Sequence, residues 1–252
     1  MANKYREQCE SNLYHITARG VAKQIIFEED RDRRFFGKKM REYLNECDVE
    51  LYAWCLMSNH VHLMVRAELD LVAKFMHKLL TSYARYFNSR HDRTGHLFQN
   101  RFDSVPITTD EQLMTAVLYI HRNPDDIPGQ NYMRYEWSSY REYIGNPFVS
   151  HTEFVLQVFG GLERFVAFHE SNCSDDNSEN SPKGPSRRLA ISDEDAIEFA
   201  KSLLGIDSVV SISSLDKTSR DNSIATLRNA GLPIHQIARI TGIGRNIVQR
   251  AK

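Results

Sequence analysis

The sequence predicts an α+β protein, in which helices pack on an antiparallel sheet, followed by a small all-α domain. Two adjacent strand-like segments, residues 49–57 and 61–66, are joined by the turn signal Ser58-Asn59 and therefore form an antiparallel hairpin. Up to about residue 145, segments with helical spacing of apolar side chains alternate with strand-like segments, which is typical of the α+β class. The C-terminal part of the chain shows helical patterns only.

The individual elements follow from local patterns. Residues 28–47 and 70–90 place aromatic and aliphatic side chains at helical spacing among charged ones. Thr108 and Glu111 form a capping box ahead of an apolar stripe, which predicts the start of a helix. In chain order we expect a strand over residues 12–19, a helix over 28–47, the hairpin, a helix over 70–90, a strand over 96–107, a helix over 108–123 and a helical segment over 148–168.

Composition divides the chain into four parts. Residues 171–188 are rich in Ser, Asn, Asp, Pro and Gly, a composition typical of a flexible linker. We therefore predict a main domain over residues 1–147, a helical extension over 148–170, a linker over 171–190 and a helical domain over 191–252.

Composition also excludes several classes of protein. With 41% apolar and 26% charged residues, the chain is expected to fold rather than stay disordered. No apolar run approaches the roughly 20 residues that cross a bilayer, and residues 1–10 lack the apolar core of a signal peptide, so we expect a cytoplasmic protein with no membrane partner. The four cysteines form no C-x-x-C pair, which argues against a zinc ribbon or a disulfide framework, and Cys55 is expected in the core.

The formal net charge of −1 conceals two basic segments and an acidic one. Residues 74–103 carry six Lys or Arg against two Asp, a net charge of +4. Residues 217–252 carry seven Lys or Arg against one Asp, a net of +6, whereas residues 170–195 carry seven acids against three basic residues, a net of −4. Two basic segments joined by an acidic one indicate two surfaces that face a polyanion, although solvated helix faces would give the same counts.

His60-Val61-His62 lies at the start of the second hairpin strand. Because side chains alternate along a strand, both imidazoles project from one face while Val61 faces the core. Two imidazoles on one face offer a bidentate site for a divalent metal ion. A His-x-His sequence is often incidental, however, so the motif needs support from elsewhere in the chain.

The helix predicted over residues 108–123 supplies that support. Tyr119 and Asn123 are four residues apart and so lie near one another on the helix surface, with Tyr119 on the flank of the apolar stripe. A side chain there is presented to a groove, and the amide oxygen of Asn123 suits a hard cation such as Mg²⁺ or Mn²⁺. A tyrosine at the rim of the core and an asparagine that ends the helix before Pro124 would give the same pattern.

Five sequence blocks follow one another along the chain: Tyr14-His15 through Arg19-Gly20, Leu56 to His62, Gly95 to Phe102, Tyr119 to Pro124, and Trp137 to Tyr140. In this order they resemble the REP-associated tyrosine transposases and the related insertion-sequence transposases of the HUH superfamily. The resemblance covers about residues 12–144 and implies a ferredoxin-like HUH nuclease fold.

The resemblance also implies a mechanism. In this family His60 and His62 would bind Mg²⁺ or Mn²⁺ with a third polar ligand from the tyrosine helix, where Asn123 stands. Tyr119 would attack the scissile phosphate of single-stranded DNA, become joined to the 5′ end and leave a free 3′-hydroxyl. A metal ion that offsets negative charge at the phosphate helps a phenol to act as a nucleophile.

One departure from the family pattern concerns the third ligand. After Pro124, the common apolar continuation is replaced by Asp125-Asp126. Two acids near a phosphate path would repel DNA unless one of them helps to hold the metal ion. Asn123 as the sole third ligand is therefore left open.

Other residues of the first domain are assigned by pattern. Phe75, Tyr83 and Phe87 are expected in the core rather than against bases, and His15 and His96 are interpreted as structural or DNA-facing. Tyr83 and Tyr86 lie on the basic helix but not four residues before a ligand in a family motif, so Tyr119 is the preferred nucleophile. Basic side chains interleaved with aromatic rings favour single-stranded DNA, here hairpin or repeat ends. The predicted DNA contacts of this domain are Lys74, Lys78, Arg85 and Arg101.

The C-terminal domain resembles a helix-turn-helix. A helix over residues 220–230 is followed by Gly231, a second short helix over 234–240, a turn at 242–244 and a third helix over 245–252. The last helix would enter the major groove of duplex DNA, although a small protein-interaction bundle would have the same pattern. The residues that would contact DNA there are Arg245, Asn246, Gln249 and Arg250.

Three functions compete at this stage. The first is a metal-dependent single-strand DNA transposase or endonuclease with a 5′-phosphotyrosine intermediate. The second is a host-adopted DNA-binding regulator with the same fold but no strand transfer, and the third is a His-x-His metallohydrolase acting on small phosphate esters. The presence of both histidines, the tyrosine and a third polar ligand favours the first, and the second basic domain argues against the third. The sequence leaves both a monomer and a homodimer open.

Overall fold

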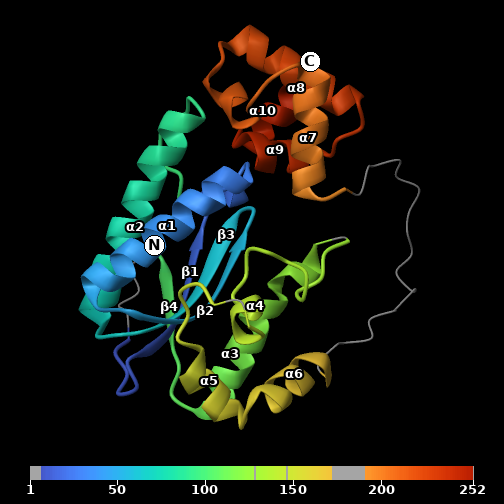
Figure 1. The fold of residues 1–252 in the computed structure, drawn as a ribbon. Helices are drawn as coiled ribbons and strands as arrows, with labels where there is room; N and C mark the ends of the chain where they lie inside the picture. The colour runs from blue at the N-terminus through green and yellow to red at the C-terminus, as the bar shows by residue number, and fades with distance from the viewer. Residues whose placement is uncertain (1–6, 128, 146, 172–190, 252) are drawn as a thin grey trace.

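The computed structural model of the chain describes residues 7–127, 129–145, 147–171 and 191–251. Figure 1 shows a sheet with helices on both sides and a group of C-terminal helices at one end. The elements are β1 (Leu13–Arg19), η1 (Val21–Lys23), α1 (Asp30–Cys47), β2 (Glu50–Met57), β3 (His60–Arg66), α2 (Leu69–Arg90), β4 (Asp103–Pro106), α3 (Asp110–Arg122), η2 (Asn123–Asp126), α4 (Tyr140–Tyr143), α5 (Thr152–Phe159), α6 (Leu162–Ser171), α7 (Asp193–Leu204), η3 (Val210–Ser214), α8 (Lys217–Asn229), α9 (Ile234–Thr241) and α10 (Arg245–Arg250).

The four strands form one antiparallel sheet in the order β2-β3-β1-β4. The predicted hairpin is present as β2 and β3, with the turn at Ser58 and Asn59. β1 lies beside β3, so that Thr17 is opposite His62 and Arg19 is opposite His60. The predicted α+β class with an antiparallel sheet is confirmed, and its topology places the N-terminal strand next to the histidine pair.

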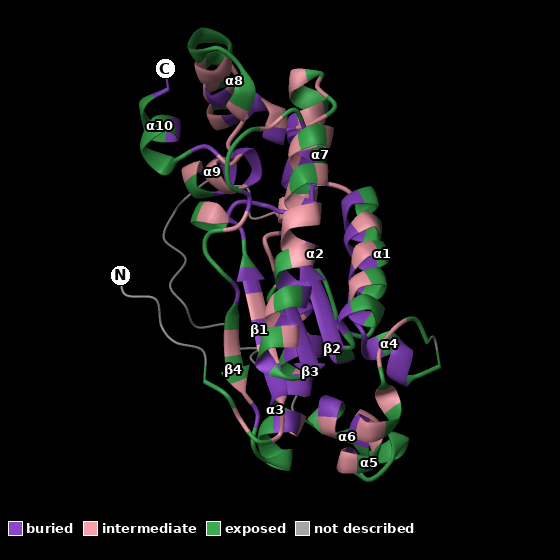
Figure 2. Cartoon of the chain, turned by 90° about the vertical axis from the view of Figure 1, so that its left-hand side faces the viewer, coloured by how far each residue is buried: buried purple, intermediate pink, exposed green. Residues whose placement is uncertain are grey.

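Helices cover the two faces of the sheet with separate apolar layers (Figures 1 and 2). α1 and α2 pack on the face to which Val61 points, and the predicted core residues Phe75, Tyr83 and Phe87 are fully buried there. α3, α5 and α6 pack on the other face, where Cys55 is also fully buried as expected. The histidines of β3 belong to this second face.

The free edge of β2 is covered by residues 137–139. The backbone N–H of Leu56 donates to the carbonyl of Trp137 at 2.8 Å, and that of Ser139 donates to the carbonyl of Trp54 at 2.9 Å. These bonds satisfy groups that an open edge would leave unpaired. The block from Trp137 to Tyr140 thus closes one side of the sheet.

Two predicted elements were wrong in their extent. Within the predicted strand 96–107, only Asp103–Pro106 is a strand, because the residues ahead of it form only an isolated bridge, between Phe98 and Gly20 just after β1. The predicted helix 148–168 is two helices, α5 and α6, because Gly160 and Gly161 between them adopt positive φ angles of 80° and 111°.

The N-terminal cap of α3 differs by one residue from the predicted Thr108 capping box. Thr109 is the capping residue, and its hydroxyl accepts from the backbone N–H of Gln112 at 3.2 Å. The side chain of Gln112 turns back to the backbone N–H of Thr108 at 2.8 Å. The helix is therefore capped by a threonine side chain, as predicted, but by the threonine one residue later along the chain.

The C-terminal helices α7 to α10 pack on the first domain (Figure 1). The backbone N–H of Ile25 donates to the carbonyl of Arg239 at 2.9 Å, and the buried Arg33 side chain pairs with Glu194 at 2.9 Å. The apolar core under α1 and α2 continues into these helices. Two of their elements, α7 and η3, were not assigned from the sequence, and residues 172–190 of the predicted linker lie outside the described part of the chain.

A buried carboxylate connects the two parts. Glu28 accepts hydrogen bonds from the hydroxyl of Ser208 and the backbone N–H of Val209, both at 2.8 Å. Its carboxylate also lies 3.4 Å from the ammonium of Lys201 and 3.3 Å from the imidazole of His91. Breaking such a buried, hydrogen-bonded network by removing one partner typically costs about 3–5 kcal/mol, so these contacts hold the C-terminal helices in place.

Two absences apply to the described residues. None of their helices is both long and apolar enough to cross a lipid bilayer. Cys9, Cys47 and Cys55 are free thiols.

Candidate functional site

The candidate site lies on the α3 face of the sheet, where β1 and β3 run side by side. Because alternate residues share a face, His15 and Thr17 of β1 project beside His60 and His62 of β3. The rings of His60 and His62 have centroids 4.9 Å apart, as the same-face prediction requires.

His62 is held by the neighbouring strand. Its Nδ1 lies 2.9 Å from Nε2 of His15 and 3.2 Å from the hydroxyl oxygen of Thr17. Its other ring nitrogen, Nε2, is buried and has no hydrogen-bond partner among the described residues. A buried polar atom without a partner is costly, and an ion that binds there is one way to satisfy it.

His60 and Asn123 face one another through Nε2 of the imidazole and Oδ1 of the amide. Nδ1 of His60 lies 2.6 Å from Oδ1 of Asn59, and Nε2 lies 3.2 Å from Oδ1 of Asn123. The amide of Asn123 is oriented by its own Nδ2, which donates to the carbonyl of Tyr119 at 3.0 Å. A neutral imidazole has a single N–H, and if Asn59 accepts it, lone pairs of His60 and Asn123 point at each other.

Burial keeps both imidazoles neutral. Desolvation lowers the pKa of His60 to about 4, and desolvation together with the charges of its neighbours lowers the pKa of His62 to about 2. Arg19, whose Cα is opposite that of His60, contributes to both shifts. The neutral imidazole is the form that binds a metal ion.

These atoms fit a divalent cation. His62 Nε2 has no partner among the described residues, and in the tautomer in which His60 donates to Asn59, lone pairs of His60 Nε2 and Asn123 Oδ1 face each other. A cation among these three atoms would use all of these lone pairs. The outer nitrogen of each ring is held by a polar neighbour, as is usual for metal-binding histidines. Within the described ranges, no group of three or more His, Cys, Asp or Glu side chains is arranged to hold a metal ion, and the third candidate donor at this site is an amide, that of Asn123.

Tyr119 stands beside the histidines. Its side chain is 53% exposed, which is unusual for a large aromatic residue on a helix that packs on a sheet. Its ring centroid lies 5.3 Å from that of His62 and 5.8 Å from that of His15. The predicted nucleophile and the predicted metal ligands are thus brought together within one chain, and the phenol is open to a substrate.

The two acids that follow Pro124 have different surroundings. Asp125 pairs with Arg122 at 2.8 Å and accepts from the backbone N–H of Tyr132 at 2.8 Å, so its carboxylate is already engaged. Asp126 is exposed, and its charge raises the pKa of His60, opposing the larger effect of burial. Asp126 is therefore the acid that can interact electrostatically with a bound cation.

A groove runs between α2 and residues 95–102. It has a volume of about 780 Å³ and is lined by Arg85 and Arg101, two of the predicted DNA contacts, and by His96. The backbone N–H of Gln99 donates to the carbonyl of Arg19 at 2.9 Å, so this segment ends beside the strand that carries the site.

The other two predicted contacts on α2 lie outside this groove. Lys74 is exposed, whereas Lys78 forms an ion pair with Glu46 and lies over the ring of Tyr43 at 5.6 Å. The structure therefore groups Arg85 with Arg101 and does not bring Lys78 to them.

In the C-terminal domain, α9 and α10 are joined by a turn at residues 242–244, as predicted. Three of the basic residues counted in the net charge of this region are used internally. Arg220 pairs with Asp221 at 3.1 Å, Arg239 pairs with Asp193 at 2.6 Å, and Arg228 donates to the carbonyl of Ala251 at 2.6 Å. The predicted contacts that are exposed on α10 are Arg245, Asn246, Gln249 and Arg250.

Sequence reasoning missed the contribution of β1. His15 and Thr17 hold His62, and Arg19 is an exposed cation at the same end of the sheet. The only signal in the sequence was that all three alternate along one strand within the first family-like block. His121, two residues after Tyr119, is buried between Ser139 and His169 and takes no part in the site.

Comparisons with known proteins find transposases. A model of the IS200-like transposase family matches residues 8–123. Among solved structures, a REP-associated tyrosine transposase bound to a REP hairpin is 13% identical, with a TM-score of 0.51 over 58% of this chain and 87% of that chain. A candidate transposase from Deinococcus radiodurans is 17% identical, with a TM-score of 0.34 over 45% of this chain and 92% of that chain. No curated protein matches the chain.

The sheet and its helices thus have the fold of a tyrosine transposase. The residues that match the IS200-like transposase family model include β1 to β4, α3 and all of the candidate site.

Proposed function

We propose that the protein is a metal-dependent transposase that cuts single-stranded DNA and forms a 5′-phosphotyrosine intermediate through Tyr119. The observation that supports this most is the exposed phenol of Tyr119 beside His62 Nε2, which has no partner among the described residues, and beside the facing atoms His60 Nε2 and Asn123 Oδ1. A tyrosine in the core would be buried, and a structural histidine pair would have its nitrogens satisfied.

Mg²⁺ or Mn²⁺ would be held by Nε2 of His60, Nε2 of His62 and Oδ1 of Asn123. Three protein ligands leave coordination positions for a phosphate oxygen and water. When bound, the ion polarises the phosphoryl group and offsets the negative charge that develops there. Thr17 and His15 position His62 for this role through its Nδ1.

The chemical step is a transfer of the phosphoryl group to the tyrosine. The oxygen of Tyr119 attacks phosphorus and loses its proton to water, a bond forms between them, and the bond to the 3′-oxygen breaks. The leaving oxygen takes up a proton and becomes a free 3′-hydroxyl. The phosphotyrosine keeps the energy of the broken bond, so a 3′-hydroxyl of another strand can reverse the step without ATP. Arg19 is placed to pair with a phosphate of the strand.

Hairpin DNA with single-stranded flanks is the substrate class that we propose. The solved relative is bound to a REP hairpin. The groove lined by Arg85 and Arg101 offers cations to a backbone that leads toward Arg19.

An adduct assay tests this function. Incubating the protein with hairpin DNA labelled at its 3′ end, in Mg²⁺ or Mn²⁺, should give a labelled protein band that resists denaturation. The same DNA labelled at its 5′ end should release a shorter fragment with an extendable 3′-hydroxyl. EDTA should abolish both products. DNA binding without any adduct in either metal would instead identify a DNA-binding regulator, the alternative function.

The C-terminal domain is proposed to bind duplex DNA through α10, which presents exposed polar and basic side chains after a short turn from α9. Replacing Arg245 and Arg250 with glutamine should weaken duplex binding about tenfold or more and lower the salt dependence by about two counterions. Adduct formation on a short single strand should stay unchanged. Lys217→Gln, in the same domain on α8, is the charge control. An unchanged duplex affinity in the double variant would favour a protein-interaction bundle.

A further inference from the structure

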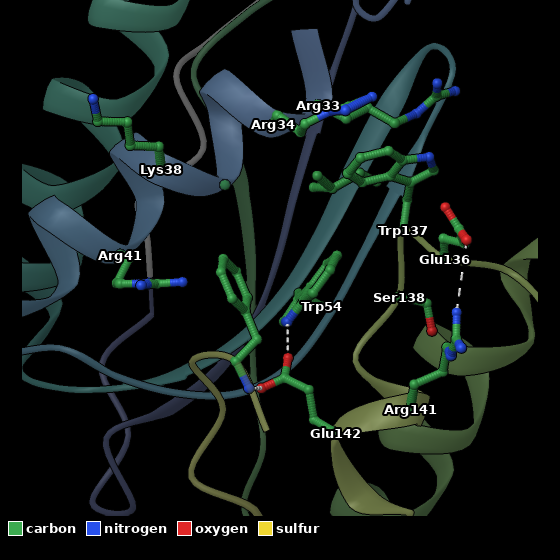
Figure 3. A pocket seen from close by; sticks show the side chains of 13 residues that line it. Arg33, Arg34, Lys38, Arg41, Trp54, Glu136, Trp137, Ser138, Arg141 and Glu142 are labelled. Atoms are coloured by element: carbon green, nitrogen blue, oxygen red, sulfur yellow. Dashed lines mark hydrogen bonds and ion pairs between the residues drawn. The ribbon is translucent and has the colours of Figure 1, made fainter. Parts of the chain in front are cut away.

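A second cavity lies on the opposite face of the sheet from the histidines, between α1 on one side and residues 136–142 and Phe148 on the other. It has a volume of about 550 Å³, within the range of roughly 300–1,000 Å³ that is usual for ligand sites. We call it the α1 pocket. It is lined by cations of α1 and Arg141, by both tryptophans of the chain, and by Phe148 (Figure 3).

Aromatic rings form one wall of the α1 pocket. Trp54 is fixed because its indole N–H donates to Glu142 at 2.5 Å, and Phe148 packs against it with ring centroids 6.2 Å apart. Phe148 is 42% exposed, although it is a large apolar side chain. Trp137 lies on the other side, with the guanidinium of Arg33 5.8 Å from its ring centroid. Phe148 and the half-buried Trp137 offer π faces to the hollow, whereas Trp54, which also lines it, is only 6% exposed.

Three basic side chains of α1 also line the pocket. Arg34, Lys38 and Arg41 are spaced four and three residues apart, so they lie on one side of the helix, and all three are exposed. The guanidinium of Arg41 lies 4.2 Å from the centroid of the Phe148 ring. In the described part of the chain, neither Lys38 nor Arg41 has an ion pair, and Arg34 has only a distant one to Asp30 at 3.8 Å.

The acids of the pocket do not cancel this charge. Glu142 is buried, and its carboxylate accepts from Trp54 and from the backbone N–H groups of Phe148, Val149 and Ser150. It therefore organises the wall of the pocket and is not available to the cations. Glu136 is at the rim, 3.8 Å from Arg141.

Gly37 keeps the pocket open. It lies in the middle of α1, where glycine costs roughly 0.5–1 kcal/mol relative to alanine, and it lines the cavity. Its φ angle is not positive, and a Cβ atom added there would meet Phe148 at an ordinary contact distance of 3.7 Å. Neither the backbone nor the space at the Cβ position requires a glycine, whereas a larger side chain would fill the hollow.

We propose that the α1 pocket binds one unpaired nucleotide of the DNA strand, with its base against the aromatic wall and its phosphate along Arg34, Lys38 and Arg41. Aromatic faces interleaved with unpaired cations are the combination that binds single-stranded nucleic acid without reading its sequence. That the strand is DNA rests on the proposed function. Because Trp54 and Leu56 belong to the α1 face and His60 and His62 to the α3 face, this contact is separate from the chemistry.

Intrinsic fluorescence reports on this pocket alone, because Trp54 and Trp137 are the only tryptophans of the chain and both line it. The full-length Tyr119→Phe variant is titrated with a hairpin that carries a short single-stranded extension, with the same hairpin lacking the extension, and with inorganic phosphate. We expect quenching by the extended hairpin only. Quenching by phosphate alone to the same extent would make the pocket a simple anion site, and quenching by the blunt hairpin would make it a duplex contact; either result would overturn the proposal.

Variants test which side chains are responsible. Lys38→Gln with Arg41→Gln should weaken the binding that quenches fluorescence by about tenfold or more, and Phe148→Ala should weaken it by about tenfold. The matched control is Arg31→Gln with Lys39→Gln, which removes the same charge from α1 outside the pocket and should leave the titration unchanged. Gly37→Leu should block quenching, and Gly37→Ala serves as its folding control.

Two results separate this proposal from the proposed function. If the extended hairpin quenches fluorescence but the wild-type protein never forms an adduct, the pocket proposal is supported and the proposed strand-cutting function is wrong. If adducts form and anisotropy shows DNA bound, but no DNA changes the fluorescence of the folded protein, the pocket proposal is wrong.

Discussion

Tyr119→Phe is expected to abolish the covalent protein–DNA adduct and to lower DNA cleavage by at least about 10³-fold, because removing a nucleophile removes the covalent route itself. Affinity for hairpin DNA should change little. The hydroxyl is on a side chain that is 53% exposed, so its loss leaves no buried group unsatisfied and the unfolding temperature should stay close to that of the wild type. The measurement is adduct yield with 3′-labelled hairpin DNA in Mn²⁺, with anisotropy for binding.

The matched control for this change is Tyr86→Phe. Tyr86 is on the basic helix α2, and its hydroxyl has no hydrogen-bond partner among the described residues, so the substitution removes the same atom elsewhere. It should leave the adduct yield unchanged. An adduct that persists in Tyr119→Phe and disappears in Tyr86→Phe would show that Tyr86 of α2, and not Tyr119, is the nucleophile.

The parts of the fold that the sequence predicted are those set by local geometry. The hairpin follows from Ser58-Asn59 between two apolar strands, and strand alternation then places His60 and His62 on one face without any knowledge of the tertiary structure. The four-residue spacing of Tyr119 and Asn123 acts in the same way on α3. The sequence therefore predicted the candidate cation site as two local pairs of residues. It did not predict the distance between the two pairs.

The parts that the sequence did not predict depend on contacts between distant segments. His15 and Thr17 reach His62 because β1 inserts between β3 and β4, a pairing that no local pattern encodes. The strand predicted over residues 96–107 is mostly a loop because only its end finds a partner strand. Local propensity favours a strand in such a segment, but whether the strand forms depends on pairing with a distant segment.

The position of the C-terminal helices shows the same limit. The polar composition of residues 171–188 predicted a tethered domain, and nothing in that composition indicated docking on the first domain. The contact depends on one buried acid, Glu28, whose partners Lys201, Ser208 and Val209 lie more than 170 positions further along the chain. The α1 pocket is likewise formed by segments, α1 and residues 136–142 with Phe148, that come together only in the folded chain.

His62→Gln is the second change with a large expected effect. Removing an outer partner of a metal ligand typically costs about 10–100-fold in metal affinity or activity, so removing the ligand itself should cost more than about 100-fold in Mn²⁺-dependent adduct formation. Its Nε2 is buried without a partner, so the wild-type side chain gains no hydrogen bond there that glutamine would lose. We therefore expect activity and Mn²⁺ affinity to fall while DNA binding and the unfolding temperature are largely kept.

Thr17→Val tests the role of a residue that orients the ligand His62 without binding the ion itself. It removes a hydroxyl 3.2 Å from Nδ1 of His62, and we expect a loss of about 10–100-fold that rising Mn²⁺ concentration partly restores. His151→Gln, a change at an exposed histidine outside the site, is the control and should be silent in Mn²⁺ titrations followed by calorimetry. If His62→Gln bound Mn²⁺ as tightly as the wild type, the unsatisfied nitrogen would be a defect of packing rather than a ligand. The contact between His60 and Asn123 would then be an ordinary hydrogen bond from Nε2 to Oδ1.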